Sequence, residues 1–130
     1  SLVSSYQPVR EILVRAQRKM ASEGGVVLEG RDIGTVVLPN ADLKVFMVAN
    51  VGERARRRKK DLEVSGIPTD EEAVVREIVD RDQKDSTRDV SPLRKAEDAI
   101  ELDTSHLTIE EQVDFIVAKA REILEKGKKR

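Results

Sequence analysis

The chain has 130 residues, with 24 Lys and Arg against 25 Asp and Glu, a formal net charge of −1 and only 2% aromatic residues. This length fits one domain or most of one, and the balanced charge argues against general attraction to nucleic-acid polymers. No apolar run approaches the roughly 20 residues of a membrane span, so we expect neither membrane insertion nor export. With no cysteine and one histidine, the sequence also lacks a disulfide framework, a thiolate nucleophile and a His or Cys metal cluster.

The N-terminal part predicts a helix followed by a short strand. Apolar residues recur at helical spacing over 8–20, and Pro8 stands in the first turn, where its missing N–H has no cost. Gly24 and Gly25 are expected to end this helix. The apolar run 26–28, stopped by polar residues, predicts a short buried strand.

Helices and strands alternate over the rest of the chain. Apolar runs predict a buried strand within 42–50 and a weaker one at 99–103. A charged helix is expected over 52–64, before a break at 66–68. A capping-box pattern beginning at Thr69 predicts a helix that runs to about 87, and a second one beginning at Thr108 predicts a C-terminal helix. The apolar face of this last helix holds five residues, Ile109, Val113, Ile116, Ala120 and Ile123. The alternation indicates an α/β fold with a parallel sheet covered on both faces, and three strands indicate part of a larger sheet.

Glycine and charged residues follow the first predicted strand. In open α/β sheets ligands bind beyond the carboxyl ends of strands. Gly30 and Gly34 would let the backbone approach a ligand, while Arg31 and Asp32 direct charge at it. The alternative is an ordinary turn with a solvated ion pair, and spacing alone does not decide between them.

Two other groups of charges suit a phosphate. Six cations within 54–60 of a predicted helix repel one another unless a polyanion neutralises them or nearby acids such as Glu53, Asp61 and Glu63 do so. Arg81, Asp85 and Arg88 share one helical face, where arginines suit a phosphate and a carboxylate suits a sugar hydroxyl. An intrahelical salt bridge is the alternative, although the cation precedes the acid in Arg81–Asp85, the less favourable order.

Five ordered stretches of the sequence together resemble bacterial cytidylate kinase. They are Ser1 with residues 8–10, GRDIGTVVLP at 30–39, ERARRR at 53–58, residues 81–88, and SPL at 91–93. A lone Gly-Arg-Asp would be weak, whereas five stretches in order are specific. The resemblance covers nearly the whole chain. It implies that residues 1–130 are the C-terminal part of a P-loop nucleoside-monophosphate kinase, with a partial three-layer parallel sheet and a lid at about 52–68.

The resemblance implies phosphoryl transfer from ATP, with Mg²⁺, to CMP or dCMP. It assigns recognition of the cytosine edge to Ser1, Arg10 and Asp32. It implies that Arg31 and Arg88 bind the CMP phosphate and that Arg81 and Asp85 bind the ribose. It further implies that Arg57 and Arg58 of the lid contact the ATP phosphates.

The 130 residues contain no Gly-x-x-x-x-Gly-Lys-Ser/Thr loop, which the family carries far N-terminal to the part resembled here. We therefore expect that this chain, which begins with Ser1 and not with Met, binds nucleotide without turning over ATP by itself. Three alternatives remain open: a kinase for another monophosphate such as UMP, a non-catalytic nucleotide or anion-binding module, and a protein that docks an acidic partner through the basic helix. The resemblance further implies a cytoplasmic monomer that binds neither nucleic-acid polymers nor membranes.

Overall fold

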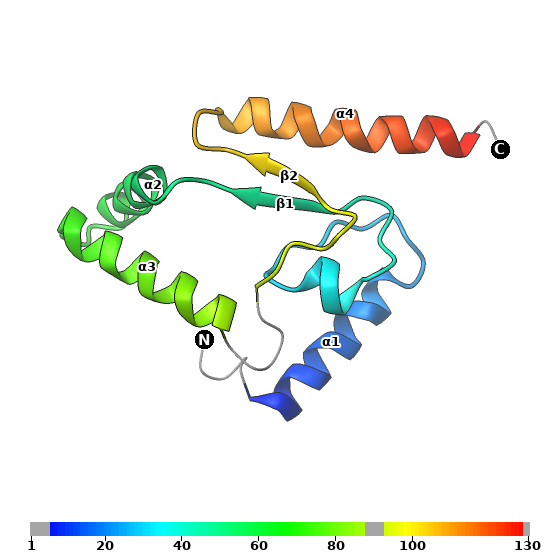
Figure 1. Ribbon diagram of the computed structural model, residues 1–130, viewed down its shortest axis with the longest axis horizontal. Coiled ribbons are helices and arrows are strands. Elements are labelled where there is room, and N and C mark those ends of the chain that lie inside the picture. Colours follow the sequence, from blue (N-terminus) through cyan, green and yellow to red (C-terminus); the bar gives the residue numbers. More distant parts are fainter. Residues whose placement is uncertain (1–5, 88–92, 129–130) are drawn as a thin grey trace.

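A computed structural model describes residues 6–87 and 93–128 (Figure 1). Helices and strands alternate along these residues, as the sequence predicts. In chain order the elements are α1 (Gln7–Ala21), the π-helical turn η1 (Ile33–Val37), β1 (Val45–Val48), α2 (Val51–Val64), α3 (Glu71–Thr87), β2 (Ile100–Asp103) and α4 (Ile109–Lys128).

The two strands form a parallel pair that confirms the α/β class. Val45 lies opposite Ile100 and Val48 opposite Asp103, and α2 and α3 make the connection between the strands. In Figure 1 both strands point toward α2, while α4 runs alongside the strand pair and α1 lies on the other side. The carboxyl ends of β1 and β2 therefore lie next to the start of α2.

The predicted strand at 26–28 does not form. The backbone there is irregular, and the Val27 side chain is 96% exposed. An isolated extended segment leaves its N–H and C=O groups unpaired, and in the described residues β1 is bonded only to β2. The apolar run alone thus does not make a strand, because no neighbouring strand accepts its hydrogen bonds.

Most helix boundaries follow the local signals. Pro8 lies in the first turn of α1, and Gly24, Gly25 and Gly66 adopt positive φ angles of 75°, 66° and 75° where the chain leaves a helix. The capping box of α4 is formed: the Glu111 N–H donates to Thr108 Oγ1 at 3.1 Å, and the Thr108 N–H donates to Glu111 Oε1 at 3.0 Å.

The capping box predicted for α3 is wrong. This helix begins at Glu71, and its first backbone bond runs from the Val74 N–H to the Asp70 carbonyl at 3.1 Å. The cap position therefore belongs to Asp70, one residue later than predicted, and Thr69 Oγ1 is buried without a hydrogen-bond partner. Asp is as good an N-cap as Thr, so the sequence did not distinguish the two starts.

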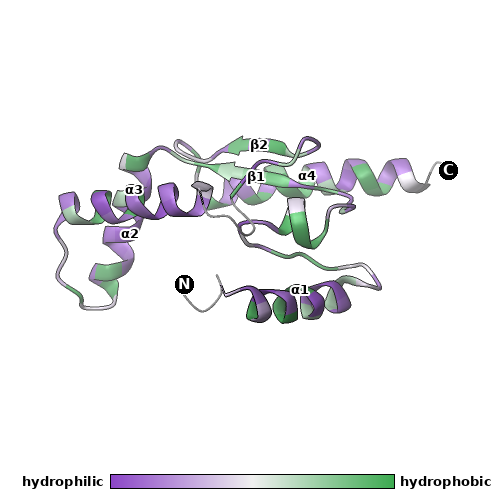
Figure 2. Cartoon of the chain, turned by 60° about the horizontal axis from the view of Figure 1, so that its bottom comes forward, coloured by the Kyte–Doolittle hydropathy of each residue, from purple (hydrophilic) through white to green (hydrophobic). Residues whose placement is uncertain are grey.

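The buried apolar core of the described residues is small, and η1, α2, α3 and β2 contribute one residue each. Its members are Val37, Ala55, Val74 and Leu102. β1, predicted to be buried, is mostly half-buried, and its Met47 is exposed. Hydrophobic and hydrophilic residues alternate around α1 and α4 in Figure 2, and the large apolar side chains Ile12 and Ile109 are exposed there. None of the helices in the described ranges combines the length and apolar character needed to cross a bilayer.

Candidate functional site

Asp32 is a buried carboxylate at the start of η1. Its backbone carbonyl accepts hydrogen bonds from the N–H groups of Val36 (2.9 Å) and Val37 (3.2 Å), which form the π-helical turn. Its side chain is paired with the guanidinium of Arg10 from α1, and both side chains are largely shielded from solvent. A buried carboxylate is tolerated when a cation partners it. The structure therefore places Arg10 and Asp32, two of the three residues that the resemblance assigns to the cytosine edge, in direct contact.

Arg31, next in the loop, reaches a different helix. Its Nε donates to Asp85 Oδ2 near the end of α3, across 54 residues of sequence. Arg81, one turn earlier on α3, places its Nε 4.0 Å from the same carboxylate oxygen. Of the predicted row Arg81, Asp85 and Arg88, the first two form the intrahelical ion pair that was the alternative interpretation, and the Asp85 carboxylate is shared between Arg81 and Arg31. We call Arg10, Asp32, Arg31, Asp85 and Arg81 the loop cluster.

The two glycines of this loop accommodate the protein's own side chains. A Cβ atom on Gly30 would lie 3.0 Å from Ile33 Cγ1, and one on Gly34 would lie 3.3 Å from Lys44 Cδ. Their role in the described structure is therefore close packing beneath the loop.

Arg18 fastens α1 to this loop, a role that the sequence analysis missed. Its Nε donates to the Val37 carbonyl at 3.0 Å, and its Nη2 donates to the Val36 carbonyl at 2.8 Å. These are carbonyls at the C-terminal side of η1, where a short helix leaves acceptors unsatisfied. The contact holds α1, and with it Arg10, beside Asp32.

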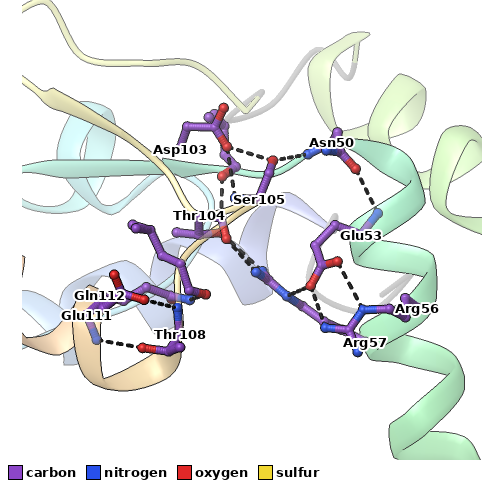
Figure 3. Close-up of polar contacts among 12 residues, drawn as sticks. Asn50, Glu53, Arg56, Arg57, Asp103, Thr104, Ser105, Thr108, Glu111 and Gln112 are labelled. Atoms are coloured by element: carbon purple, nitrogen blue, oxygen red, sulfur yellow. Dashed lines mark hydrogen bonds and ion pairs between the residues drawn. The ribbon is translucent and has the colours of Figure 1, made fainter.

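A second group of polar residues lies where the two parallel strands end. Arg57 of α2 donates from Nη1 to Thr104 Oγ1 (3.1 Å), from Nη2 to the Thr104 carbonyl (2.5 Å) and from Nε to Glu53 Oε1 (3.0 Å). Figure 3 shows the guanidinium extending from α2 to the residue that follows β2. We call Arg57, Glu53 and Thr104 the sheet-edge cluster.

A chain of short hydrogen bonds joins the same two strand ends beside this cluster (Figure 3). The Asn50 N–H donates to Ser105 Oγ at 2.8 Å, and Ser105 Oγ donates to Asp103 Oδ1 at 2.7 Å. Asn50 also caps α2, because its side-chain oxygen accepts from the Glu53 N–H at 2.7 Å. The start of α2 is thereby fixed to the end of β2.

Carboxylates neutralise part of the basic helix. Hydrogen bonds from Arg56, reinforced by Arg57, lower the pKa of Glu53 from 4.5 to about 2. Arg54 forms a two-point contact with Asp82 of α3, with N–O distances of 2.5 and 2.7 Å, and this contact lowers the pKa of Asp82. Three of the six cations, Arg54, Arg56 and Arg57, are therefore paired with acids of the protein itself.

The remaining cations of the helix have no acidic partner among the described residues. Arg58, Lys59 and Lys60 make no side-chain hydrogen bond or ion pair there, and Arg58 and Lys60 are exposed. Like charges at neighbouring positions of a helix repel one another. Residues 58–60 are therefore the part of α2 whose positive charge is not balanced by an acid of the described residues.

Two predicted site residues, Ser1 and Arg88, lie outside the described residues. No group of three or more His, Cys, Asp or Glu in the described ranges could hold a metal ion. The described side chains therefore form no all-protein metal cage, whereas Mg²⁺ in kinases is held by one or two carboxylates together with substrate phosphates.

Sequence reasoning missed three of the acceptors that hold cationic side chains. Thr104 and Asp82 were not singled out, and neither was Asp98, which accepts from Lys44 Nζ at 2.9 Å. A usable signal exists for Thr104 alone, since polar residues directly after a parallel strand lie at the edge where sites form. Asp82 and Asp98 are ordinary surface acids in sequence, and only the packing of the elements selects them.

The family profile and the similar proteins all point to one family. The profile of a family described as cytidylate kinase matches residues 1–122. The chain is 54% identical over 127 residues to a cytidylate kinase of Streptococcus thermophilus, covering 98% of this chain. It is 54% identical over 124 residues to one of Lactococcus lactis and 55% identical over 126 residues to one of Streptococcus gordonii. In each case the match spans 56% of the relative's own length.

Proposed function

Because this chain belongs to the cytidylate kinase family, we propose that the protein carrying it transfers the γ-phosphoryl group of ATP to CMP or dCMP. The products are ADP and CDP or dCDP. One observation carries the proposal: residues distant in sequence come together in the loop cluster, where Arg31 and Arg81 share Asp85 and Arg10 pairs with buried Asp32.

Asp32 and Arg10 are proposed to recognise cytosine, together with Ser1. A carboxylate accepts hydrogen bonds only, so it suits the exocyclic amine of cytosine, whereas uracil presents a carbonyl at the same place. The guanidinium of Arg10 supplies donors for the carbonyl oxygen and the unprotonated ring nitrogen of cytosine. The Arg10 guanidinium compensates the charge of this buried carboxylate. This arrangement favours CMP over UMP.

Arg31 and Arg88 are proposed to bind the CMP phosphate, and Arg81 and Asp85 the ribose. Arg31 donates one N–H to Asp85, so its four other N–H groups can serve a phosphate. Arginine suits this role because its planar fork matches two phosphate oxygens. Asp85 can accept a ribose hydroxyl beside the arginines.

The lid over about 52–68, which includes α2, is proposed to bring Arg57 and Arg58 to the ATP phosphates. A phosphate monoester has a second pKa of about 6, so CMP already presents an anionic oxygen near neutral pH and needs no side-chain base. Catalysis then consists of aligning two polyanions and offsetting their repulsion with cations. Mg²⁺ accompanies ATP in such kinases. Its protein ligands are proposed to lie mostly outside these 130 residues.

The complete fold is proposed to be that of a P-loop nucleoside-monophosphate kinase, acting in the cytoplasm as a monomer, with this chain as its C-terminal part. The 130 residues lack the P-loop sequence. We infer that they bind nucleotide without turnover when expressed alone. A polypeptide of these residues, shown to be folded by circular dichroism, should bind CMP in calorimetry and form no CDP.

The gene product that carries this chain tests the activity directly. Incubated with ATP and Mg²⁺, it should convert CMP and dCMP to diphosphates, with a kcat/KM for CMP at least about tenfold above that for UMP, the size of one good hydrogen bond to a charged group. Chromatographic separation of the nucleotides measures the products. Equal kcat/KM for CMP and UMP would contradict the assignment to cytidylate.

A matched pair of arginine variants tests the site. Arg31→Ala should lower kcat/KM for CMP about 100-fold or more, because it removes a cation aimed at charged oxygens. Arg121→Ala, at an exposed position of α4, should leave kcat/KM unchanged. Similar losses in both variants would place the phosphate elsewhere.

A further inference from the structure

Thr104 differs from the other hydroxyl residues of the described chain in its burial. With Asp32 it is one of two buried polar residues among those described, and it is only 3% exposed. It follows directly after β2, at the carboxyl end of the strand pair. None of the roles proposed above uses it.

The position of Thr104 is set by β1. Its N–H donates to the Val48 carbonyl at 2.7 Å, which continues the parallel ladder by one residue, and its hydroxyl donates to the same carbonyl at 3.2 Å. The single hydroxyl proton is thereby committed to Val48. The Oγ1 lone pairs remain as acceptors, and Arg57 Nη1 donates to them at 3.1 Å.

The Thr104 hydroxyl and carbonyl fix the plane of the Arg57 guanidinium. Together with Glu53 they engage three of its five N–H groups, one on each nitrogen. One N–H on each terminal nitrogen is left over, and the Arg57 side chain is 35% exposed. Arg58, the next residue, has no such acceptors among the described residues and is exposed.

We propose that Thr104 is a positioning residue that holds the Arg57 guanidinium at the carboxyl edge of the sheet, with two N–H groups free for an ATP phosphate. The Arg57 guanidinium is thus oriented before a phosphate binds, whereas that of Arg58, on the same helix, is not. The inference rests on the proposed phosphoryl transfer. Preorganisation matters because a guanidinium that is already oriented loses less freedom when it binds an anion.

Substitution of Thr104 tests this in the gene product that carries the chain. Thr104→Val keeps the shape and the backbone carbonyl but removes the hydroxyl acceptor, and it should lower kcat/KM for ATP about tenfold. The KM for CMP should stay within about twofold, because the loop cluster is untouched. Thr104→Ser retains the hydroxyl and should restore most of the kcat/KM for ATP.

A double-mutant cycle separates positioning from mere stability. In an Arg57→Lys background, Thr104→Val should change kcat/KM for ATP by less than about twofold, because the fork that Thr104 orients is already absent. Thr108→Val, which breaks the cap of α4, serves as the control for lost stability and should leave kcat/KM for ATP unchanged. Additive losses in the cycle, or equal losses in Thr104→Val and Thr108→Val, would overturn the inference.

Calorimetry with ATP alone gives a readout that does not depend on turnover. Thr104→Val should weaken ATP binding about tenfold relative to the unchanged protein, and Thr104→Ser should not. Unchanged ATP affinity in Thr104→Val would refute the positioning role even if CMP is phosphorylated. Conversely, weakened ATP affinity in a protein that phosphorylates a different monophosphate would support the role of Thr104 while refuting the cytidylate assignment.

Discussion

The loop cluster and the sheet-edge cluster both hold arginines beside carboxylates, but they do so in different ways. Arg57 at the sheet edge is bonded to a main-chain carbonyl and a hydroxyl at the end of β2 as well as to Glu53. Arg31 in the loop cluster makes its one hydrogen bond to the side chain of Asp85. The strand-end acceptors are held by the backbone hydrogen bonds of the strand pair, whereas a side-chain carboxylate can change its partner. We therefore expect the Arg57 guanidinium to keep its orientation on binding and the loop cluster to rearrange.

The largest loss of stability is expected when the buried carboxylate of the loop cluster is removed. Asp32→Ala leaves the Arg10 guanidinium without its buried carboxylate, so the free energy of unfolding should fall by about 3–5 kcal/mol. Urea titration of the purified protein measures the loss. Asp42→Ala, at an exposed position nearby, should change stability by no more than about 0.5 kcal/mol. Equal effects of the two substitutions would show that the buried pair contributes nothing.

An intermediate effect is expected at the shared carboxylate. Asp85→Asn removes the negative charge that holds Arg31 and Arg81 and should raise the KM for CMP about tenfold, through the lost charged hydrogen bond to the ribose. Steady-state rates at varied CMP measure this change, and the KM for ATP should not respond because Arg57 is held elsewhere. Asp80→Asn on the exposed side of α3 is the control. A larger change in the KM for ATP than for CMP would reverse the assignment of the two clusters.

The smallest effect concerns pH at the sheet edge. The folded-state pKa of Glu53 is about 2 against an ordinary 4.5, so its ion pairs stabilise the fold above about pH 4.5 and weaken as the pH falls toward 2. The urea midpoint of the unchanged protein should therefore exceed that of Glu53→Gln at about pH 6, and the gap should narrow toward about pH 3. Glu63→Gln, also on α2, should show no such narrowing. A gap independent of pH would mean that the ion pairs of Glu53 do not stabilise the fold.

Local signals in the sequence were sufficient for most of the fold. Each of the four α-helices and both strands of the described residues was expected near its observed place, because helical periodicity, caps and glycines act over a few residues, whereas the π-helical turn η1 was not expected. The strand expected at 26–28 failed because pairing depends on a neighbour and not on the run itself. The start of α3 shifted by one residue because Asp70 competes with Thr69 for the cap.

The candidate site was predictable in part. Arg31, Asp32 and Asp85 were selected by charge and by position in a glycine-containing loop or on one helix face, and the structure pairs Arg31 with Asp85 and Asp32 with Arg10. The partners Thr104 and Asp82 depend on which helix crosses which strand end. That information resides in the tertiary packing, so no local pattern could supply it.

The long connection between β1 and β2 has a consequence for how the chain folds. Asn50 and Ser105, which meet at the strand ends, are 55 residues apart in sequence, and Arg31 and Asp85 are 54 apart. Closing loops of this length has a high entropic cost, whereas α2 and α3 are neighbours that need only a short turn. We expect the helical hairpin to form first and to shorten the loop that the strands must close. Both arginine clusters are then assembled late, after most of the chain has already collapsed.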